Sequence, residues 1–159
     1  MMSARPGHAA APPRGCTSLK LRQLSRRVSQ HYDSHVSAAG LKTTQYSLLS
    51  HIAQLGPLRP GELAARMEME PSTLTRNLQP LVAQGWVEVG AGDSGRSRLV
   101  SITEAGRAKR AEAQAAWKRA QLSLNAALGI ERVSQLHALI DDSLAALHAA
   151  TDPTGEDLP

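Results

Sequence analysis

Residues 58–103 decide the fold of this chain. They contain the segment GELAARM at 61–67 and, after a short gap, PSTLTRNLQPLVAQGWVE at 71–88. Pro60 and Pro71 stand just before the apolar positions of these segments, and proline is favoured in the first turn of a helix. The pattern therefore predicts two short helices separated by a tight turn, which is a helix-turn-helix.

The second of these helices, expected to run from Pro71 or Ser72 to Gly85, separates apolar from polar side chains. Its apolar stripe consists of Leu74, Leu78, Leu81 and Val82. The opposite face carries Ser72, Thr73, Thr75, Arg76 and Gln79. We expect the helix to continue through Pro80, because the stripe continues beyond it. A helix in the major groove presents side chains to base edges, so this polar face is a candidate DNA-binding surface. The alternative is an ordinary solvated face.

After this helix the apolar period changes from that of a helix to that of a strand. Residues 86–89 and 98–102 alternate between apolar and polar side chains. Between them lies 90–97, a turn-rich loop with three glycines. One β-hairpin with a long tip is predicted, in the position of a wing. Its Arg96 and Arg98 suit contacts with phosphate or with a narrow minor groove.

Further helices are expected on both sides of this unit. Apolar periodicity and glycine or proline stop signals place them at 17–39, 43–55, 103–128 and 131–149. We expect Thr17 or Ser18 to cap the first of them. In the second, the positions expected to point inward are Leu48, Leu49, Ile52 and Leu55.

The predicted fold class is mainly α with one small β-hairpin: a winged helix-turn-helix plus N- and C-terminal dimerisation helices. We divide the chain into a flexible leader at 1–15, a single domain at 16–150 and a flexible tail at 151–159. Within the domain, residues 40–106 form the winged helix-turn-helix, and 17–39 and 107–149 form the dimerisation helices.

The apolar stripe of the last helix needs a cover, and a second copy of the chain is the simplest one. A two-fold dimer also supplies the symmetry that reading two half-sites requires. Packing of these helices within one chain is the alternative. The expected dimerisation residues are Leu21, Leu24, Leu136, Ile140, Leu144 and Leu147.

Composition and charge agree with a nucleic-acid partner. The 159 residues are 42% hydrophobic and 20% charged, which is typical of a globular protein, and the net charge is +4. Basic residues exceed acidic ones in 1–85, and acidic residues exceed basic ones in 86–159. Such asymmetry favours one face that meets a polyanion, although a random distribution is the alternative. No apolar run is long enough to span a membrane and no secretory signal is evident, so we expect a cytoplasmic, nucleoid-associated protein.

Four segments resemble the winged helix-turn-helix of the MarR (multiple antibiotic resistance regulator) family of bacterial transcription regulators. They are TTQYSLL at 43–49, GELAARM at 61–67, PSTLTRNLQPLVAQGWVE at 71–88 and DSGRSRLVSITEAG at 93–106. The resemblance extends over residues 17–149. It implies a homodimer in which the first, fifth and sixth helices interlock. Each subunit would place one recognition helix and one wing on a pseudo-palindromic operator. We expect a repressor that a small-molecule effector releases from double-stranded operator DNA.

The wing departs from the family pattern at one position. Relatives usually carry an acidic residue two positions before the wing arginine, where it can brace the guanidinium. In this chain position 94 is Ser, and the acidic residue is Asp93, three positions before Arg96. The resemblance therefore implies a DNA contact for Arg96 but leaves its bracing by Asp93 in question.

Cys16 is the one redox candidate. It stands just before the first predicted helix, near Arg14 and Lys20, and these surroundings can lower the pKa of a thiol. Peroxide-sensing relatives carry a reactive cysteine early in the first helix, but alignment from Tyr32 places Ser18 at that position. We favour an inert cysteine and keep a thiol-based redox regulator as an alternative. With a single cysteine, an intramolecular disulfide or a Cys-rich zinc site is excluded.

Five residues are candidates for binding an aromatic or anionic effector, and they are His31, Tyr32, His35, Tyr46 and His51. His31 and His35 are four positions apart and share a helix face, a spacing that also suits a divalent metal. No third ligand is evident beside them, so we expect no metal site, and a surface or interface pair is the alternative. Tyr46 and His51 serve equally well as core or interface residues.

No enzyme motif is recognisable in the sequence. A glycine-rich phosphate loop, a nucleophile elbow, paired carboxylates in a patterned cleft and a metal signature are all missing. We therefore expect neither catalysis nor a cofactor. A winged helix that binds only proteins is the remaining alternative, and salt-dependent binding to duplex DNA distinguishes it from a DNA-binding regulator.

Overall fold

The computed structural model describes residues 11–92 and 94–151. Most of the expected leader, nearly all of the expected tail and the proposed brace Asp93 lie outside these residues. In the part of the chain that the structure describes, no helix combines the length and the apolar character needed to cross a membrane.

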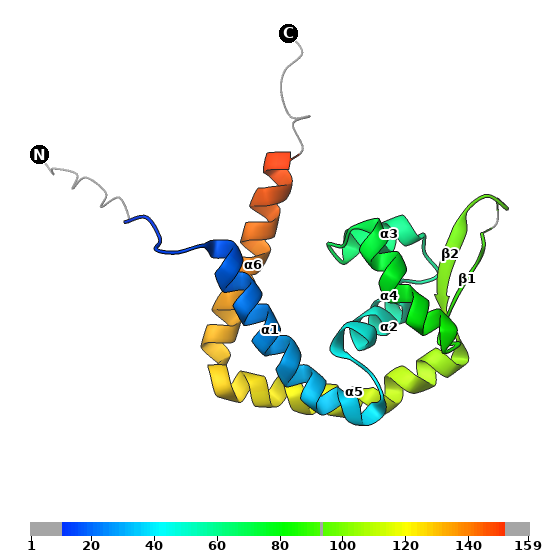
Figure 1. Ribbon diagram of the computed structural model, residues 1–159, viewed down its shortest axis with the longest axis horizontal. Helices are drawn as coiled ribbons and strands as arrows, with labels where there is room; N and C mark the ends of the chain where they lie inside the picture. Colours follow the sequence, from blue (N-terminus) through cyan, green and yellow to red (C-terminus); the bar gives the residue numbers. More distant parts are fainter. Residues whose placement is uncertain (1–10, 93, 152–159) are drawn as a thin grey trace, which may run out of the picture.

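The expected fold class is confirmed: helices form most of the described chain, and one antiparallel hairpin interrupts them (Figure 1). The helices are α1 (Thr17–Val36), α2 (Thr43–Leu55), α3 (Pro60–Arg66), α4 (Pro71–Ala83), α5 (Glu104–Leu128) and α6 (Ile130–Thr151). A short 3₁₀ helix, η1 (Ser37–Ala39), follows α1, and strands β1 (Val87–Ala91) and β2 (Arg98–Ile102) form the hairpin.

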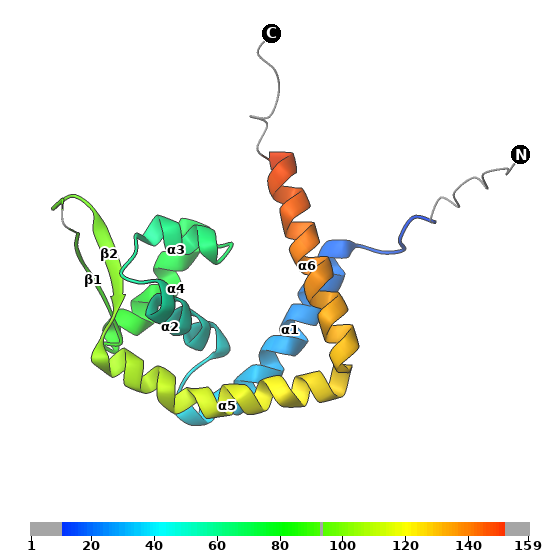
Figure 2. The same ribbon diagram turned by 180° about the vertical axis from the view of Figure 1, so that it is seen from behind.

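The chain is arranged as two arms on a common base. Helix α5 forms the base, α1 and α6 form one arm, and α2, α3, α4 and the hairpin form the other (Figures 1 and 2). One described contact crosses the open side between the arms, where His148 Nε2 lies 2.9 Å from Glu68 Oε1. Both side chains are more than 45% exposed, and such exposed pairs contribute little to stability.

The second arm contains the hydrophobic core. Its fully buried side chains come from α2, α3, α4 and the hairpin, and they include Leu48, Leu49, Ile52, Leu63, Leu74, Leu81, Val87 and Val100. Proline or glycine marks most of the helix ends here, as the sequence predicts: Pro60 and Pro71 begin α3 and α4, and Gly56 follows α2. These stop signals divide the apolar segments into short helices that pack around one centre.

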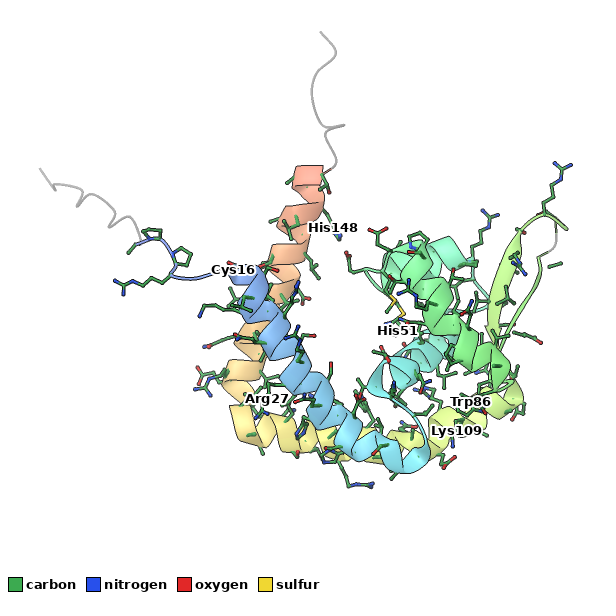
Figure 3. All side chains as sticks on the ribbon, viewed as in Figure 1. Cys16, Arg27, His51, Trp86, Lys109 and His148 are labelled. Carbon is green, nitrogen blue, oxygen red and sulfur yellow. The ribbon has the colours of Figure 1, made fainter. Side chains whose placement is uncertain are left out.

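The start of α5 is packed tightly against the base of the hairpin. Thr103 caps the helix, because its Oγ1 accepts the Gly106 N–H at 3.1 Å and donates to the Gly85 carbonyl at 2.6 Å. A Cβ on Gly106 would lie 2.0 Å from the Trp86 carbonyl oxygen. Lys109 Nζ lies 5.6 Å from the centre of the Trp86 ring, and Figure 3 labels both residues at this junction.

Three local predictions are wrong. Thr17 and Ser18 do not cap α1, because Thr17 is already helical; Cys16 holds the cap position without a side-chain hydrogen bond. Leu55 is 38% exposed, since it ends α2 just beyond the core. Val82 is 42% exposed, because it lies at the edge of the α4 stripe. The prediction for Pro80 is confirmed: it lies inside a continuous α4.

Candidate nucleic-acid interface and effector cavity

The polar residues of α4 form one exposed face. Ser72, Thr73, Thr75, Arg76 and Gln79 are all exposed, whereas Leu74, Leu78 and Leu81 are buried beneath them. Thr75 Oγ1 donates to the Pro71 carbonyl at 3.0 Å, which leaves its oxygen lone pairs facing solvent. Among the described residues, no carboxylate forms an ion pair with Arg76. The helix therefore offers the guanidinium donors of Arg76 and the acceptor sites of the Thr75 hydroxyl on its solvent side.

The hairpin carries two further arginines, and one of them lies beside this face. Arg98 begins β2 and pairs with Ala91 of β1, and Arg96 lies in the exposed tip. Arg98 lines a cleft of about 460 Å³ between α4 and the hairpin, together with Thr75, Gln79 and Val82. Arg98 therefore extends the polar face of α4 toward the wing, while Arg96 lies farther out on the hairpin.

A second cavity, of about 420 Å³, lies between α1, α2 and α5. Tyr32, Tyr46 and Trp117 give it an aromatic side: the Tyr46 and Trp117 rings are stacked with centres 5.7 Å apart, and Tyr32 lies 6.4 Å from Trp117. Burial raises the pKa of the Tyr32 phenol above its ordinary value. Tyr32 is therefore a neutral donor at neutral pH, and its hydroxyl bonds Gln121 Oε1.

The cavity also has a polar lining. Arg110 donates from Nε to Ser50 Oγ at 3.1 Å, which holds the guanidinium at the cavity wall. His51 Nδ1 lies 2.8 Å from the Ser47 carbonyl, so Nδ1 carries the proton and Nε2 of a neutral ring remains an acceptor. Figure 3 labels His51 on α2, on the inner side of the two-armed shape. Aromatic side chains together with a guanidinium suit a flat anionic molecule, because the rings can pack against its plane and Arg110 can pair with its charge.

The structure brings together only part of the predicted effector set. Tyr32, Tyr46 and His51 line the cavity, but His31 and His35 do not. His31 Nε2 lies 3.0 Å from the Ala120 carbonyl and 2.9 Å from Ser123 Oγ, so it ties α1 to α5. His35 Nδ1 bonds the His31 carbonyl at 2.9 Å.

Sequence reasoning missed Arg110 and Trp117 in this cavity. They are seven positions apart on α5, and that spacing places two residues on one face of a helix. A tryptophan in an alanine-rich helix, two turns after an arginine, was the available signal.

The metal and redox candidates gain no support from the surrounding residues. Within 11–92 and 94–151, no group of three His, Cys, Asp or Glu side chains is placed to hold an ion. Asp33, between the two histidines, instead accepts the Thr43 N–H at 2.7 Å and so caps α2. Cys16 is exposed and is the only cysteine of the chain, so a second thiol within the chain is not available to it.

The arm formed by α1 and α6 carries an uncovered apolar groove. A hollow of about 400 Å³ runs between α1, α5 and α6, lined by Leu21, Leu24, Leu124, Leu128, Leu136 and Ile140. None of the 22 residues of α6 is buried, and Leu139 and Leu147 are 65% and 63% exposed. Leu144 is half-buried on the same helix. Exposed apolar surface of this extent marks an interaction site.

The fold, with the exposed polar face of α4 beside a β-hairpin, defines a winged helix-turn-helix protein, and known proteins resemble it in sequence and fold. The MarR family model matches residues 39–97. Among curated proteins, the uncharacterized HTH-type transcriptional regulator YwoH of Bacillus subtilis (strain 168) is 27% identical over 85 residues. That match spans 54% of this chain and 62% of YwoH, less than two thirds of its length.

Solved structures cover much more of the chain. The transcriptional regulator MosR of M. tuberculosis, in complex with DNA, is 34% identical with a TM-score of 0.73, over 84% of this chain and 98% of MosR. A mutant of MarR from E. coli, complexed with operator DNA, has a TM-score of 0.72 at 23% identity, over 80% and 92% of the two chains; this second likeness concerns the fold alone. The chain belongs to the MarR family of transcription regulators.

Proposed function

We propose that this regulator is a homodimeric repressor that binds a pseudo-palindromic operator in double-stranded DNA. The observation that carries the proposal is the exposed polar face of α4 beside a wing with two arginines. In this reading α4 enters the major groove, and Ser72, Thr73, Thr75, Arg76 and Gln79 contact base edges or nearby phosphates. Arg96 and Arg98 contact the backbone or the minor groove. MosR, which is 34% identical, has been crystallised with DNA.

The apolar groove on α1, α5 and α6 supports the dimer. A second copy would cover the leucines that a single chain leaves exposed, among them Leu21, Leu24 and Leu147. Two-fold symmetry would then set the distance between the two α4 helices. Recognition of two half-sites on one side of the duplex needs a separation of about 34–36 Å.

The cavity between α1, α2 and α5 supports release by an effector. Its walls belong to both arms and to the base, so an occupant would contact the three elements that fix the position of α4 relative to the dimer helices. A change in that position alters the separation of the two α4 helices and weakens both half-sites together. The aromatic wall and Arg110 favour a small aromatic anion as the ligand.

Fluorescence polarisation with duplexes from the DNA flanking the gene tests this function. We expect tight binding to one palindromic duplex, weak binding to a shuffled duplex, and affinity that falls linearly on a log–log plot as salt rises. Equal binding to both duplexes contradicts the repressor. An absence of salt-dependent DNA binding favours a winged helix that binds only proteins.

The effector step has a separate test. Titration of aromatic carboxylates into the preformed complex should release the operator in the wild type. Arg110→Gln should weaken that release without changing the affinity for DNA, because Arg110 belongs to the cavity and not to the α4 face. Release that is identical in the variant would place the effector elsewhere.

A further inference from the structure

A small polar cleft lies on the side of α4 that faces away from the hairpin. Its volume is about 160 Å³, and its polar lining comes from Lys42, Thr44 and Gln45 at the start of α2 and from Arg76 and Asn77 of α4. Neither the family likeness nor the exposed face of α4 assigns a role to Lys42, Thr44 or Asn77. The cleft is separate from the larger one that Arg98 lines.

The lining of this cleft is suited to an anion. It contains two cationic side chains, a hydroxyl and two side-chain amides, and no carboxylate. Among the ion pairs of the described chain, none involves Lys42 or Arg76. Asp33 Oδ1 accepts the Thr43 N–H, but Asp33 is not among the lining residues of the cleft. Gln45 Oε1 accepts the Lys42 N–H at 2.9 Å. The NH₂ group of the Gln45 amide remains available to donate to an anion.

The size of the cleft admits a small anion. Since a water molecule occupies about 30 Å³ of the liquid, a cleft of about 160 Å³ has room for a phosphate-sized group. A phosphodiester of a duplex has this size and carries a negative charge. The cleft thus matches one backbone phosphate.

The position of the cleft tells which phosphate it would hold. Thr75 and Gln79 face the hairpin, and Arg76 and Asn77 face the start of α2, so the two clefts flank α4 on opposite sides. A helix in the major groove has one phosphate strand along each wall of the groove. If the wing contacts one DNA strand, the start of α2 therefore lies beside the other DNA strand.

We infer that Lys42, with Thr44 beside it, binds a backbone phosphate of the strand opposite the one that Arg98 contacts. This inference rests on the proposed binding of α4 to duplex DNA. The two phosphate contacts would clamp α4 in the groove and fix its depth and register. Lys42 is then a positioning residue that carries no sequence preference.

Lys42→Gln tests the contact, because it removes the charge and leaves most of the side chain. We expect operator and shuffled duplexes to lose affinity by the same several-fold factor, and the log–log salt slope to fall by about 1. Lys118→Gln on α5 is the matched control, since Lys118 is also exposed but lies on the base helix. Its affinity and slope should equal those of the wild type.

Single methylphosphonates, which neutralise one phosphate each, locate the partner. The methylphosphonate is placed at each position of one half-site in turn. At one position it should weaken DNA binding by the wild type but not weaken binding by Lys42→Gln any further. The same scan with Arg98→Gln should identify a second methylphosphonate that has no further effect on that variant. The two methylphosphonates should lie on opposite strands. Provided that the wild type binds DNA, two outcomes would overturn the inference. One is a wild-type salt slope in Lys42→Gln, and the other is that both methylphosphonates lie on the same strand. A wild type that does not bind duplex DNA overturns the proposed function as well.

Discussion

We expect the readout of the operator sequence to depend most on the side chain of Arg76. It is exposed at the middle of the polar face of α4, and its guanidinium can give two parallel hydrogen bonds to guanine. Arg76→Ala should therefore weaken operator binding by about 1–3 kcal/mol and relax the preference for the operator over a shuffled duplex. Polarisation titrations of both duplexes measure this, and circular dichroism controls for the fold. An unchanged ratio of the two affinities would remove Arg76 from base recognition, even if overall affinity fell through the neighbouring cleft.

Arg96 belongs to the wing tip and should act differently. Its exposed position in the loop between β1 and β2 suits the backbone or the minor groove and not a base edge of the major groove. Arg96→Ala should weaken binding to all duplexes similarly and lower the salt slope by about 1. Titrations over a series of salt concentrations provide the slope. Wild-type affinity and slope in this variant would mean that the wing tip does not touch DNA.

Tyr32 should show its burial in an alkaline titration. Burial raises the pKa of this phenol in the folded chain, because the charged phenolate loses its hydration. In a Tyr46→Phe variant Tyr32 is the only tyrosine, so phenolate absorbance should appear above the ordinary pKa of about 10. The contribution of Tyr32 to the free energy of unfolding is fully present below the unfolded-state pKa and is lost as pH rises through the folded-state pKa. Titration at the ordinary value would place Tyr32 in solvent and contradict its burial in the structure.

At the scale of helices and strands, most of the fold follows from local signals. Pro60, Pro71 and Gly129 mark helix ends in the sequence, and the structure ends or begins helices beside them. Leu55 and Val82 were misplaced because an apolar residue at the end or edge of a stripe has no local signal for its exposure. Burial at such positions depends on the element that packs opposite.

The two cavities could not be predicted in full, because they join residues far apart in the chain. Arg110 bonds Ser50 across 60 positions. Arg76 and Lys42 line one cleft, although the whole of α2 and of α3 lies between them in the sequence. Periodicity gives the face of a helix that a residue occupies, but not the residue that faces it from another helix. The polar face of α4 was predictable, since its residues share one helix.

The tight packing between the hairpin and the start of α5 predicts how a substitution of Gly106 changes the stability of the protein. Gly106→Ala should gain about 0.5–1 kcal/mol from helix propensity, but its Cβ would lie 2.0 Å from the backbone oxygen of Trp86. Overpacking against backbone typically costs about 1–3 kcal/mol or more, so the clash should prevail and the variant should be less stable. Urea unfolding measures the difference.

Gly61→Ala is the matched control for this substitution. Gly61 lies in α3, and an added Cβ there would meet nothing within 4 Å. The same exchange should therefore stabilise the protein by about 0.4–1 kcal/mol. Destabilisation of similar size in both variants would show that the close contact with Trp86 is not the cause.

At the scale of the whole molecule, the two arms are joined mainly through their base. The contact between Glu68 and His148 is exposed on both sides, so its contribution is small and salt-sensitive. The angle between the arms is therefore set by the packing of α1 and α2 on α5, where the aromatic cavity lies. In the proposed dimer, a ligand in that cavity would act on the elements that control the spacing of the two α4 helices, as effector release requires.

The dimer is the prediction on which DNA binding as a whole depends. Ile140 is 40% exposed and lines the apolar groove between α1, α5 and α6 with Leu136. Ile140→Asp would place an unpaired carboxylate in the contact that we propose between two copies, and burying such a charge is very costly. We expect loss of the dimer, or loss of folding, since interlocked dimers often have no stable monomer. Operator binding should disappear with it, because one half-site supplies too few contacts.

Analytical ultracentrifugation at micromolar concentration decides the matter. Ala138→Asp adds the same charge to α6 at an exposed position on the opposite side of the helix from the groove. It should remain dimeric and bind the operator, so that a defect confined to Ile140→Asp assigns the interface to the groove. A wild-type protein that sediments as a monomer, yet binds its operator tightly, would contradict the dimer and leave the exposed leucines of α6 to another partner.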